Sequence, residues 1–198
     1  FLRRLLPVIF ATLGLGALAS AAEPTPGYYR FPAIHGDTIV FTAEGDLWRA
    51  SASGGTAQRL TTHAGLEFGA AISPDGKWLA FSAQYEGPTE VYVMPLGGGL
   101  PKRLTYEGET AQVRGWTPDG KSVLFASGRV SAPTDYTKLF TIPVAGGPAK
   151  QLPAYMGFRG SFAPDGQRIV VDRVDRWDVE FRSYRGGQNT PLTITTIA

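Results

Sequence analysis

A short turn sequence that recurs along the chain constrains the fold more than any other feature. The tetrapeptide Ser73-Pro74-Asp75-Gly76 returns as Thr117-Pro118-Asp119-Gly120 and again as Ala163-Pro164-Asp165-Gly166, at spacings of 44 and 46 residues. A degenerate copy, His35-Gly36-Asp37, precedes the first by about 40 residues, with Gly36 in the place of Gly76. Periods of 40 to 46 residues are typical of solenoids, propellers and other repeat arrays.

Other landmarks keep the phase of this turn. An apolar residue stands one position before the tetrapeptide at Ile72, Trp116 and Phe162, and another stands five positions after its glycine at Phe81, Phe125 and Val171. The units continue with Asp46-Leu47-Trp48-Arg49, Glu90-Val91-Tyr92-Val93 or Lys138-Leu139-Phe140-Thr141, and then with a Gly-Gly pair beginning at Gly54, Gly97 or Gly146. They close with Arg59-Leu60-Thr61, Arg103-Leu104-Thr105 or Gln151-Leu152-Pro153. Chance would not hold so many landmarks in phase, so the units are structural repeats.

The composition of each unit predicts short strands rather than helices. Its apolar residues are β-branched or aromatic and form runs of four to seven, separated by Pro-Asp-Gly and Gly-Gly turns. This pattern predicts four antiparallel strands per unit. In the first turn, proline presets φ at the first corner, aspartate can bond to nearby backbone, and glycine accepts the positive φ that ends the turn. The 25 glycines and 15 prolines, with 18% charged residues, also favour a turn-dense β protein.

Four strands per 40 to 46 residues predict an all-β fold built from the blades of a β-propeller, which protect their edges by radial repetition. We place a linker at 22–30, blade 1 at 31–61, blade 2 at 68–105, blade 3 at 112–152 and a partial blade 4 at 158–198. The last unit carries a charged insertion from Arg173 to Gln188 that we expect to be a solvated loop. A propeller needs roughly four to eight blades to close. We therefore expect an incomplete ring and, because the chain begins with Phe1 rather than Met, a fragment of a longer protein.

Residues 1–21 have the layout of a secretory signal peptide: two arginines, an apolar stretch from Leu5 to Ala19, and small residues up to the cleavage region. Cleavage fits after Ala19 or Ala21. The apolar stretch contains a proline and a glycine and is short for a hydrocarbon core of roughly 30 Å, although an uncleaved anchor and a buried helix are alternatives. The chain has no cysteine, which excludes disulfides and thiol catalysis. We expect a periplasmic or secreted bacterial protein.

The charge of the chain gives no reason to expect nucleic acid as a partner. The formal net charge is +2, and the leader contributes Arg3 and Arg4 without any acid, which leaves 17 basic and 17 acidic residues in the remainder. A neutral body lacks the basic footprint of a nucleic-acid-binding protein. It also provides little repulsion between copies. We therefore expect residues 22–198, with the exposed faces of an open ring, to self-associate or to form a marginally stable β-rich state.

The two histidines do not predict a catalytic site. His35 falls in the first turn and His63 in the loop after Arg59-Leu60-Thr61. A Ser-His-Asp triad needs a base with an orienting acid and a nucleophile on a prepared turn, and the chain contains no Gly-x-Ser-x-Gly elbow. Two histidines without cysteine also make a poor zinc site. We expect both to be loop residues that face water, and we predict no catalytic residue.

Three other groups of residues have simple structural interpretations. The turn already accounts for Asp75, Asp119 and Asp165, whose surroundings lack the oxygen ligands that calcium needs. Gly97-Gly98-Gly99 is not followed by Lys-Ser or Lys-Thr and is expected to connect two strands rather than bind phosphate. We therefore predict no metal ligand and no cofactor site. Trp48, Tyr92 and Trp116 occupy repeat positions and are expected in the packing between blades. Trp177 lies outside the repeat phase and is a candidate contact residue, with a local packing role as the alternative.

The ordered set of motifs resembles the WD40-like propeller repeats of TolB and Tricorn proteases. Three stretches resemble most closely the amino-terminal propeller of bacterial Tricorn-like proteases: Arg30-Phe31-Pro32-Ala33-Ile34 with Gly36-Asp37, the region from Val91-Tyr92-Val93 to Phe125, and Tyr184-Arg185-Gly186-Gly187. The resemblance covers residues 28 to 196. Asn189-Thr190-Pro191-Leu192-Thr193-Ile194 departs from the acidic and aromatic strand that is usual there.

In that family, the propellers precede a PDZ-like domain and a serine-protease core related to carboxy-terminal processing peptidases, and the catalytic residues lie far downstream. The resemblance implies a non-catalytic propeller region of an exported serine protease. That region would guide or dock peptide or protein substrates, with the downstream protease domains as its partners in the same chain. Homo-oligomers are known in the family, so assembly of the full-length protein is left open. A TolB-like periplasmic protein-binding propeller without enzymatic activity is the main alternative, and the propeller of a prolyl-oligopeptidase-like hydrolase is a third.

Overall fold

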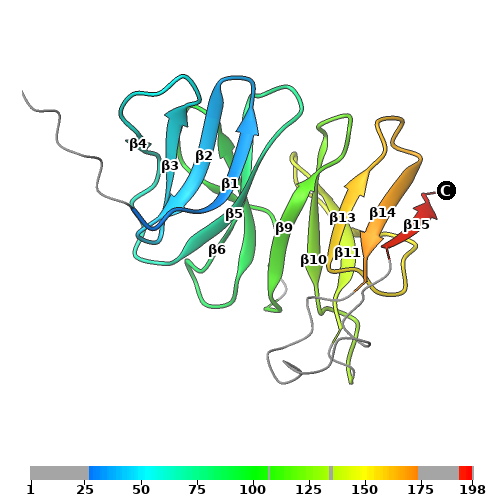
Figure 1. Ribbon diagram of the computed structural model, residues 1–198. Helices are drawn as coiled ribbons and strands as arrows, with labels where there is room; N and C mark the ends of the chain where they lie inside the picture. The colour runs from blue at the N-terminus through cyan, green and yellow to red at the C-terminus, as the bar shows by residue number, and fades with distance from the viewer. Residues whose placement is uncertain (1–26, 107, 134–135, 174–191, 198) are drawn as a thin grey trace, which may run out of the picture.

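The computed structural model describes residues 27–106, 108–133, 136–173 and 192–197 (Figure 1). Within these ranges every regular element is a β-strand, which confirms the all-β prediction. The described residues contain no helix that is long and apolar enough to cross a membrane. The predicted signal peptide, Trp177 and nearly all of the charged insertion lie outside the described residues.

The strands form four separate antiparallel sheets, which we call blades 1 to 4. Blade 1 contains β1 (Arg30–His35), β2 (Thr38–Ala43), β3 (Asp46–Ser51) and β4 (Gln58–Arg59). Blade 2 contains β5 (Glu67–Ile72), β6 (Trp78–Ala83), β7 (Glu90–Pro95) and β8 (Lys102–Arg103). Blade 3 contains β9 (Ala111–Trp116), β10 (Ser122–Ser127), β11 (Lys138–Pro143) and β12 (Lys150–Gln151). Blade 4 contains β13 (Arg159–Phe162), β14 (Arg168–Asp172) and β15 (Leu192–Thr196).

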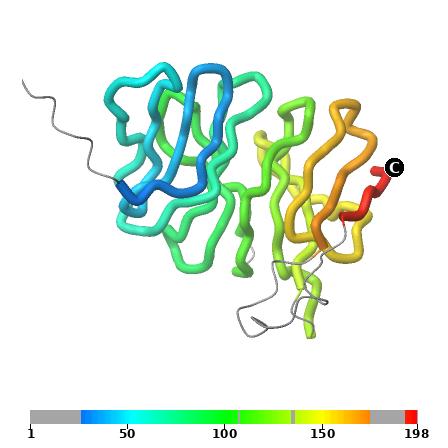
Figure 2. The backbone as a smooth tube through the Cα atoms, in the orientation of Figure 1, coloured from blue at the N-terminus to red at the C-terminus, as the bar shows by residue number. Residues whose placement is uncertain are grey.

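The blades follow one another in chain order, and each is a simple up-and-down meander (Figure 2). The first strands of successive blades contact each other, β1 with β5, β5 with β9, and β9 with β13. The predicted four-stranded antiparallel blades and open array are therefore confirmed. Residues 192–194, the described part of the segment that departs from the family pattern, lie in β15, where Leu192 pairs with Asp172 and Ile194 pairs with Val170.

The Pro-Asp-Gly turn joins the first two strands of a blade as predicted. In blade 2, Gly76 N donates to Ser73 O at 2.9 Å, and Gly76 has a φ of +69°. Asp75 Oδ1 accepts from Ser73 Oγ at 2.6 Å and from Lys77 N at 3.1 Å. These two bonds favour the ionised carboxyl and lower the pKa of Asp75. The aspartate thus stabilises the hairpin itself.

Three apolar clusters hold the array together, one at each junction between neighbouring blades. The first is formed by Val40, Leu47, Leu79, Phe81, Ala83, Tyr92 and Met94. The second is formed by Ala80, Val91, Val93, Leu104, Ala111, Val113, Trp116, Val123, Phe125, Phe140 and Ile142. The third is formed by Leu124, Ala126, Leu139, Leu152, Ile169 and Val171. A fully buried aliphatic or phenyl side chain contributes about 1.5 to 3 kcal/mol, so the junctions carry much of the stability.

Two of the three aromatic landmarks lie at the described junctions, and the third lies in blade 1 outside them. Tyr92 belongs to the first cluster and Trp116 to the second, where its indole Nε1 donates to Ala71 O of blade 2 at 2.9 Å. Trp48 is half-buried and lies outside all three clusters, with its Nε1 bonded to Ala43 O at 3.1 Å. The expected inter-blade position is therefore observed for two of these three residues.

Candidate functional site

Glu67, the first residue of β5, is a fully buried acid at the junction between blades 1 and 2. Its backbone N–H donates to Gly45 O of blade 1 at 2.8 Å. Equivalent bonds to the preceding blade are donated by Ala111 N at 2.8 Å and by Gly157 N at 2.9 Å. The three residues are equivalent in sequence too, because each stands six positions before the turn tetrapeptide. At these three junctions, the first has a carboxyl where the others have a methyl group or a hydrogen.

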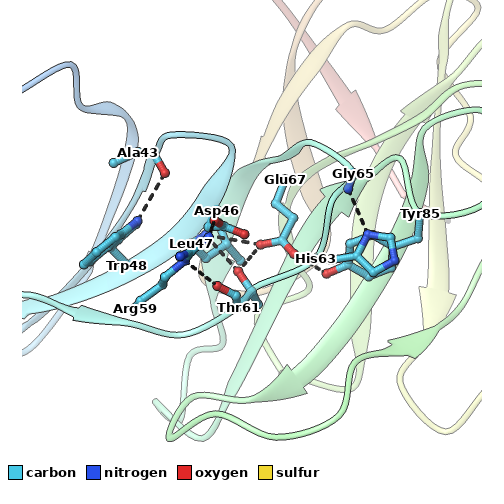
Figure 3. A network of polar contacts seen from close by, with 10 residues as sticks. All are labelled: Ala43, Asp46, Leu47, Trp48, Arg59, Thr61, His63, Gly65, Glu67 and Tyr85. Atoms are coloured by element: carbon cyan, nitrogen blue, oxygen red, sulfur yellow. Dashed lines mark hydrogen bonds and ion pairs between the residues drawn. The ribbon is translucent and has the colours of Figure 1, made fainter.

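The Glu67 carboxyl connects the two blades through three donors (Figure 3). Thr61 Oγ1 of blade 1 and the Tyr85 hydroxyl of blade 2 both donate to it. Leu47 N donates to Glu67 Oε2 at 3.2 Å and to Thr61 Oγ1 at 2.9 Å. A buried carboxyl with several donors is satisfied rather than orphaned, so the network can be maintained inside the junction.

Burial has the largest effect on the pKa of the two titratable groups in this network, Glu67 and Tyr85. Loss of water around Glu67 raises the pKa of its carboxyl, and the nearby negative charge of Asp46 raises it further. The hydrogen bonds from Thr61, Tyr85 and Leu47 oppose this effect without cancelling it. Burial, followed by the hydrogen bond to Glu67, also raises the pKa of Tyr85. The tyrosine therefore remains a neutral donor.

Beside this acid, Asp46, Arg59 and Thr61 join the start of the third strand to the end of the fourth, and we call them the clasp of blade 1. Asp46 begins β3, is buried, and forms an ion pair with Arg59. Arg59 Nε also donates to Thr61 O at 3.1 Å. The clasp thus connects the motif that opens the third strand with the Arg-Leu-Thr motif that closes the unit.

Blade 2 has a corresponding clasp, formed by Glu90, Arg103 and Thr105, in which the threonine hydroxyl donates to the clasp acid, whereas Thr61 donates to Glu67. Glu90 is buried, and its carboxylate accepts from Arg103 at 2.8 Å and from Thr105 Oγ1. Arg103 Nε donates to Thr105 O at 2.7 Å, and Val91 N donates to Thr105 Oγ1 at 2.9 Å. Glu86 adds a second, exposed ion pair to Arg103 at 2.6 Å. A buried carboxylate needs such partners because an unpaired buried charge is very costly.

Blade 3 lacks all three members of the clasp. Lys138 stands in the place of the acid, Gln151 in the place of the arginine, and Pro153 in the place of the threonine. If blade 3 had the acid without the arginine, a carboxylate would be buried and unpaired, which is costly. The absence of the arginine is therefore consistent with the absence of the acid. The clasp is therefore a structural unit that is present in blades 1 and 2 and replaced as a whole in blade 3.

His63 lies at the exposed end of the Glu67 network. Its ring centroid is 4.0 Å from that of Tyr85, and its Nδ1 accepts from Gly65 N at 2.9 Å. In a Ser-His-Asp triad, Nδ1 carries a proton and donates it to the aspartate. The accepting role of Nδ1 in His63 is the opposite, so this histidine is not arranged as a triad base. The described residues include no group of three or more histidines and acids that could hold a metal ion.

His35 has a structural contact of its own at the opposite end of the blades. Its imidazole lies against Gly76 of the next blade, since a Cβ atom on Gly76 would be 2.9 Å from the ring. Pro74 lies in the same way against Gly120, with a corresponding distance of 3.6 Å. His35 thus takes part in the packing between successive turns, while remaining exposed.

A cavity of about 420 Å³ between blades 3 and 4 is the second candidate site. Ligand pockets in proteins are typically about 300 to 1,000 Å³ and combine apolar walls with a few polar groups. The lining residues are Glu109, Thr110, Gln112, Arg114, Ala126, Gly128, Ala132, Pro133, Tyr136, Thr137 and Phe158. Its size lies within that range, and its lining combines charged, polar and apolar residues.

Arg114 organises one wall of this cavity. Its Nε donates to Phe158 O of blade 4 at 2.6 Å, and one terminal nitrogen donates to Gln112 Oε1 at 2.7 Å. The guanidinium carbon is 4.2 Å from the centre of the Phe158 ring, a cation–π distance. A planar cation fixed in this way presents a pre-organised polar surface to the cavity.

Neither Glu67 nor Arg114 is among the candidates that the motifs indicate. Both break the repeat pattern, which is the signal that could have identified them. Glu67 is equivalent to Ala111 and Gly157, and Arg114, three positions before its turn, is equivalent to Ala70 and Gly160. At both repeat positions the other units have alanine or glycine. A charged residue at such a position therefore marks a polar feature of the array.

Comparisons with known proteins agree with this architecture. The family described as the Tricorn protease N-terminal beta propeller domain matches residues 26–198. The Tricorn protease homolog 1 of Streptomyces coelicolor is 37% identical over 172 residues, which are 85% of this chain and 16% of that protein. The crystal structure of the tricorn protease has a TM-score of 0.70 at 25% identity, over 86% of this chain and 17% of that one. The crystal structure of TolB from Acinetobacter baumannii has a TM-score of 0.65 at 25% identity, over 86% and 41%. The chain thus spans about a sixth of these two Tricorn proteins.

Proposed function

Because the chain belongs to the family of Tricorn protease N-terminal beta propeller domains, we propose that it is the non-catalytic propeller region of an exported Tricorn-like serine protease. In this role it docks peptide or protein substrates for a catalytic core located elsewhere in the protein. The signal-peptide layout of residues 1–21 supports the proposal of export.

The observation that supports docking most directly is the cavity between blades 3 and 4. Its lining includes Thr110 and Gln112 at the start of β9 and Phe158 just before β13. Glu109 and Arg114 give it both charges, while Phe158 and Pro133 give it apolar walls. Extended peptides offer backbone amides and carbonyls to such polar groups and side chains to such walls.

Filling the cavity tests the docking role. Thr110 is exposed and lines it, so Thr110→Trp should occupy the space and weaken binding of a labelled peptide library at least tenfold, measured by fluorescence anisotropy. Thr56→Trp is the matched control, because Thr56 is also exposed and lines a different cavity of about 260 Å³ in blade 1. Equal binding by both variants and the unaltered chain would contradict docking at this site.

A peptidase assay tests the non-catalytic role separately. The purified chain should not hydrolyse peptides, because His63 is not arranged as a triad base. Saturable hydrolysis that survives replacement of both His35 and His63 would show that catalysis occurs here by another route.

The TolB-like alternative is favoured by the TolB structure, of which this chain covers a larger share than of the tricorn protease. It predicts a protein-binding propeller whose complete chain has no peptidase activity. Hydrolysis of peptides by the complete protein would favour the Tricorn-like function, and tight binding of a protein partner without hydrolysis would favour the alternative.

A further inference from the structure

Arg114 and Phe158 form a cationic and aromatic wall of the cavity between blades 3 and 4. The guanidinium carbon of Arg114 is 4.2 Å from the centre of the Phe158 ring. Arg159, the residue after Phe158, places a second guanidinium carbon 5.5 Å from the centre of the same ring. Because Arg114 and Phe158 both line the cavity, a group that enters it meets a cation and an aromatic ring together.

The repeat does not require this pair. Arg114 stands three positions before its turn, and Phe158 stands five positions before the next one. At the second junction the equivalent residues are Ala70 of blade 2 and Gln112 of blade 3, which cannot form a cation–π contact. That junction is closed by the backbone bond from Ala111 and by an apolar cluster. The pair in the third junction is therefore an addition to the repeat, at the place where a cavity lies.

Protein acceptors already engage each nitrogen of the Arg114 guanidinium. Its Nε donates to Phe158 O at 2.6 Å, one terminal nitrogen donates to Gln112 Oε1 at 2.7 Å, and the other donates to Val113 O at 3.4 Å. A carboxylate that bound in the plane of the guanidinium would compete with these acceptors. An aromatic ring stacks on the plane itself and leaves the hydrogen bonds in place. Arg114 is thus better arranged to contact a ring than a carboxylate.

The charges of the lining also favour a neutral aromatic group. Glu109 lines the cavity together with Arg114. The Glu109 carboxylate disfavours an acidic side chain, and the guanidinium disfavours a basic one. An aromatic ring suits both groups, because its face carries partial negative charge and its edge carries partial positive charge.

Tyr136 contributes a second ring to the lining. This ring packs against Tyr155, with centroids 5.3 Å apart, and Lys138 Nζ is 5.7 Å from its centre. The cavity has a volume of about 420 Å³, whereas an apolar cavity of about 150 Å³ is enough to bind benzene. A phenyl, phenol or indole group therefore fits beside the rings of the lining.

We propose that the cavity between blades 3 and 4 selects peptides by an aromatic side chain, which enters beside Arg114, Phe158 and Tyr136. This inference rests on the docking role proposed above and names the side chain that the site accepts. An aromatic side chain gains cation–π and ring contacts here that an aliphatic side chain of equal size does not gain.

A matched series of peptides tests the selection by fluorescence anisotropy with the purified chain. The probes are short labelled peptides of glycine and serine, blocked at both ends, that differ in one central residue: phenylalanine, cyclohexylalanine or leucine. Cyclohexylalanine is apolar and close in size to phenylalanine but has no π-electrons, so the comparison separates ring contacts from burial of apolar surface. The phenylalanine peptide should bind at least about fivefold more tightly than the cyclohexylalanine peptide.

Variants of the lining test whether the preference arises in this cavity. Phe158→Leu removes the ring and keeps the backbone carbonyl that accepts from Arg114, so the preference for phenylalanine should fall to less than about twofold. Tyr136→Leu, in the β10–β11 connection, alters no strand and should also reduce the preference. Phe68→Leu is the matched control, because Phe68 is the half-buried phenylalanine at the equivalent position of blade 2. This control should keep the full preference.

The outcomes separate this inference from the docking role. Equal binding of the phenylalanine and cyclohexylalanine peptides would overturn aromatic selection and would still support docking. A preference that persists in both Phe158→Leu and Tyr136→Leu, or that is lost equally in Phe68→Leu, would overturn the assignment to this cavity. Absence of binding by every peptide would overturn both docking and selection.

Discussion

The first two blade junctions differ in chemistry although their backbones are joined in the same way. At both, the first residue of a blade donates its N–H to the preceding blade at 2.8 Å, from Glu67 in one and from Ala111 in the other. The first junction buries a carboxyl with hydroxyl partners, and the second buries a methyl group within an apolar cluster. We call the equivalent N–H···O bonds between successive blades the backbone frame. This frame forms with either a carboxyl or a methyl side chain at the first residue of a blade, so the polar network of Glu67 is an addition to the repeat.

The largest loss of stability should come from truncating a side chain in the apolar cluster of the second junction. Trp116→Ala removes a buried indole and leaves Ala71 O without its donor, so the free energy of unfolding should fall by about 3 to 5 kcal/mol. His63→Ala alters only the exposed end of the first junction and should stay within about 0.5 kcal/mol. Chemical denaturation of both variants is the measurement. Similar shifts in the denaturation midpoint would contradict the assignment of Trp116 to the junction.

Loss of a clasp should have the next largest effect. Arg103→Met leaves the buried Glu90 carboxylate without its cation, which should cost about 2 to 4 kcal/mol, at or below the range for a fully buried pair. The matched change in blade 3, Gln151→Met, removes no ion pair and should cost within about 0.5 kcal/mol. Blade 3 replaces all three clasp residues together, which suggests that they stabilise a blade as one unit. An equal loss of stability in the two variants would contradict this role.

The smallest effect should come from neutralising Glu67, and it should depend on pH. The folded protein raises the pKa of Glu67 above its unfolded value of 4.5, so the native state holds the proton more tightly. The stability that this carboxyl provides is complete below pH 4.5 and is lost as the pH rises through the higher folded pKa. Each unit of elevation corresponds to about 1.4 kcal/mol.

Glu67→Gln removes this titration while keeping a similar shape. Its stability should match that of the unaltered chain in acid and exceed it at neutral pH, as measured by urea unfolding across that range. A variant that is weakened more at neutral pH than in acid would show that the ionised carboxyl stabilises the junction.

The repeat allowed the local structure to be predicted well. The turn depends on its own Pro, Asp and Gly, so the hairpin of Asp75 and Gly76 follows directly from local chemistry. The alternation of apolar residues placed Ile72 and Trp116 at the ends of first strands, as observed.

The polar network depends on residues that the chain brings together from separate loops. Glu67 is bonded to residues 6, 18 and 20 positions away, and no local pattern predicts such contacts. The same holds for Arg114, whose partner Phe158 is 44 positions away. Only their departure from the repeat marks both residues in the sequence.

Amide hydrogen exchange of the Glu67→Ala variant tests the shared backbone frame most directly. The N–H groups of residues 67, 111 and 157 each donate across a junction, to Gly45, Thr89 and Thr137, so all three should exchange slowly in the unaltered chain. We expect residue 67 to keep its protection in the variant, because alanine is the residue at the second junction. Fast exchange at residue 67, with residues 111 and 157 still protected, would show that the first junction depends on its carboxyl and that the frame is not shared.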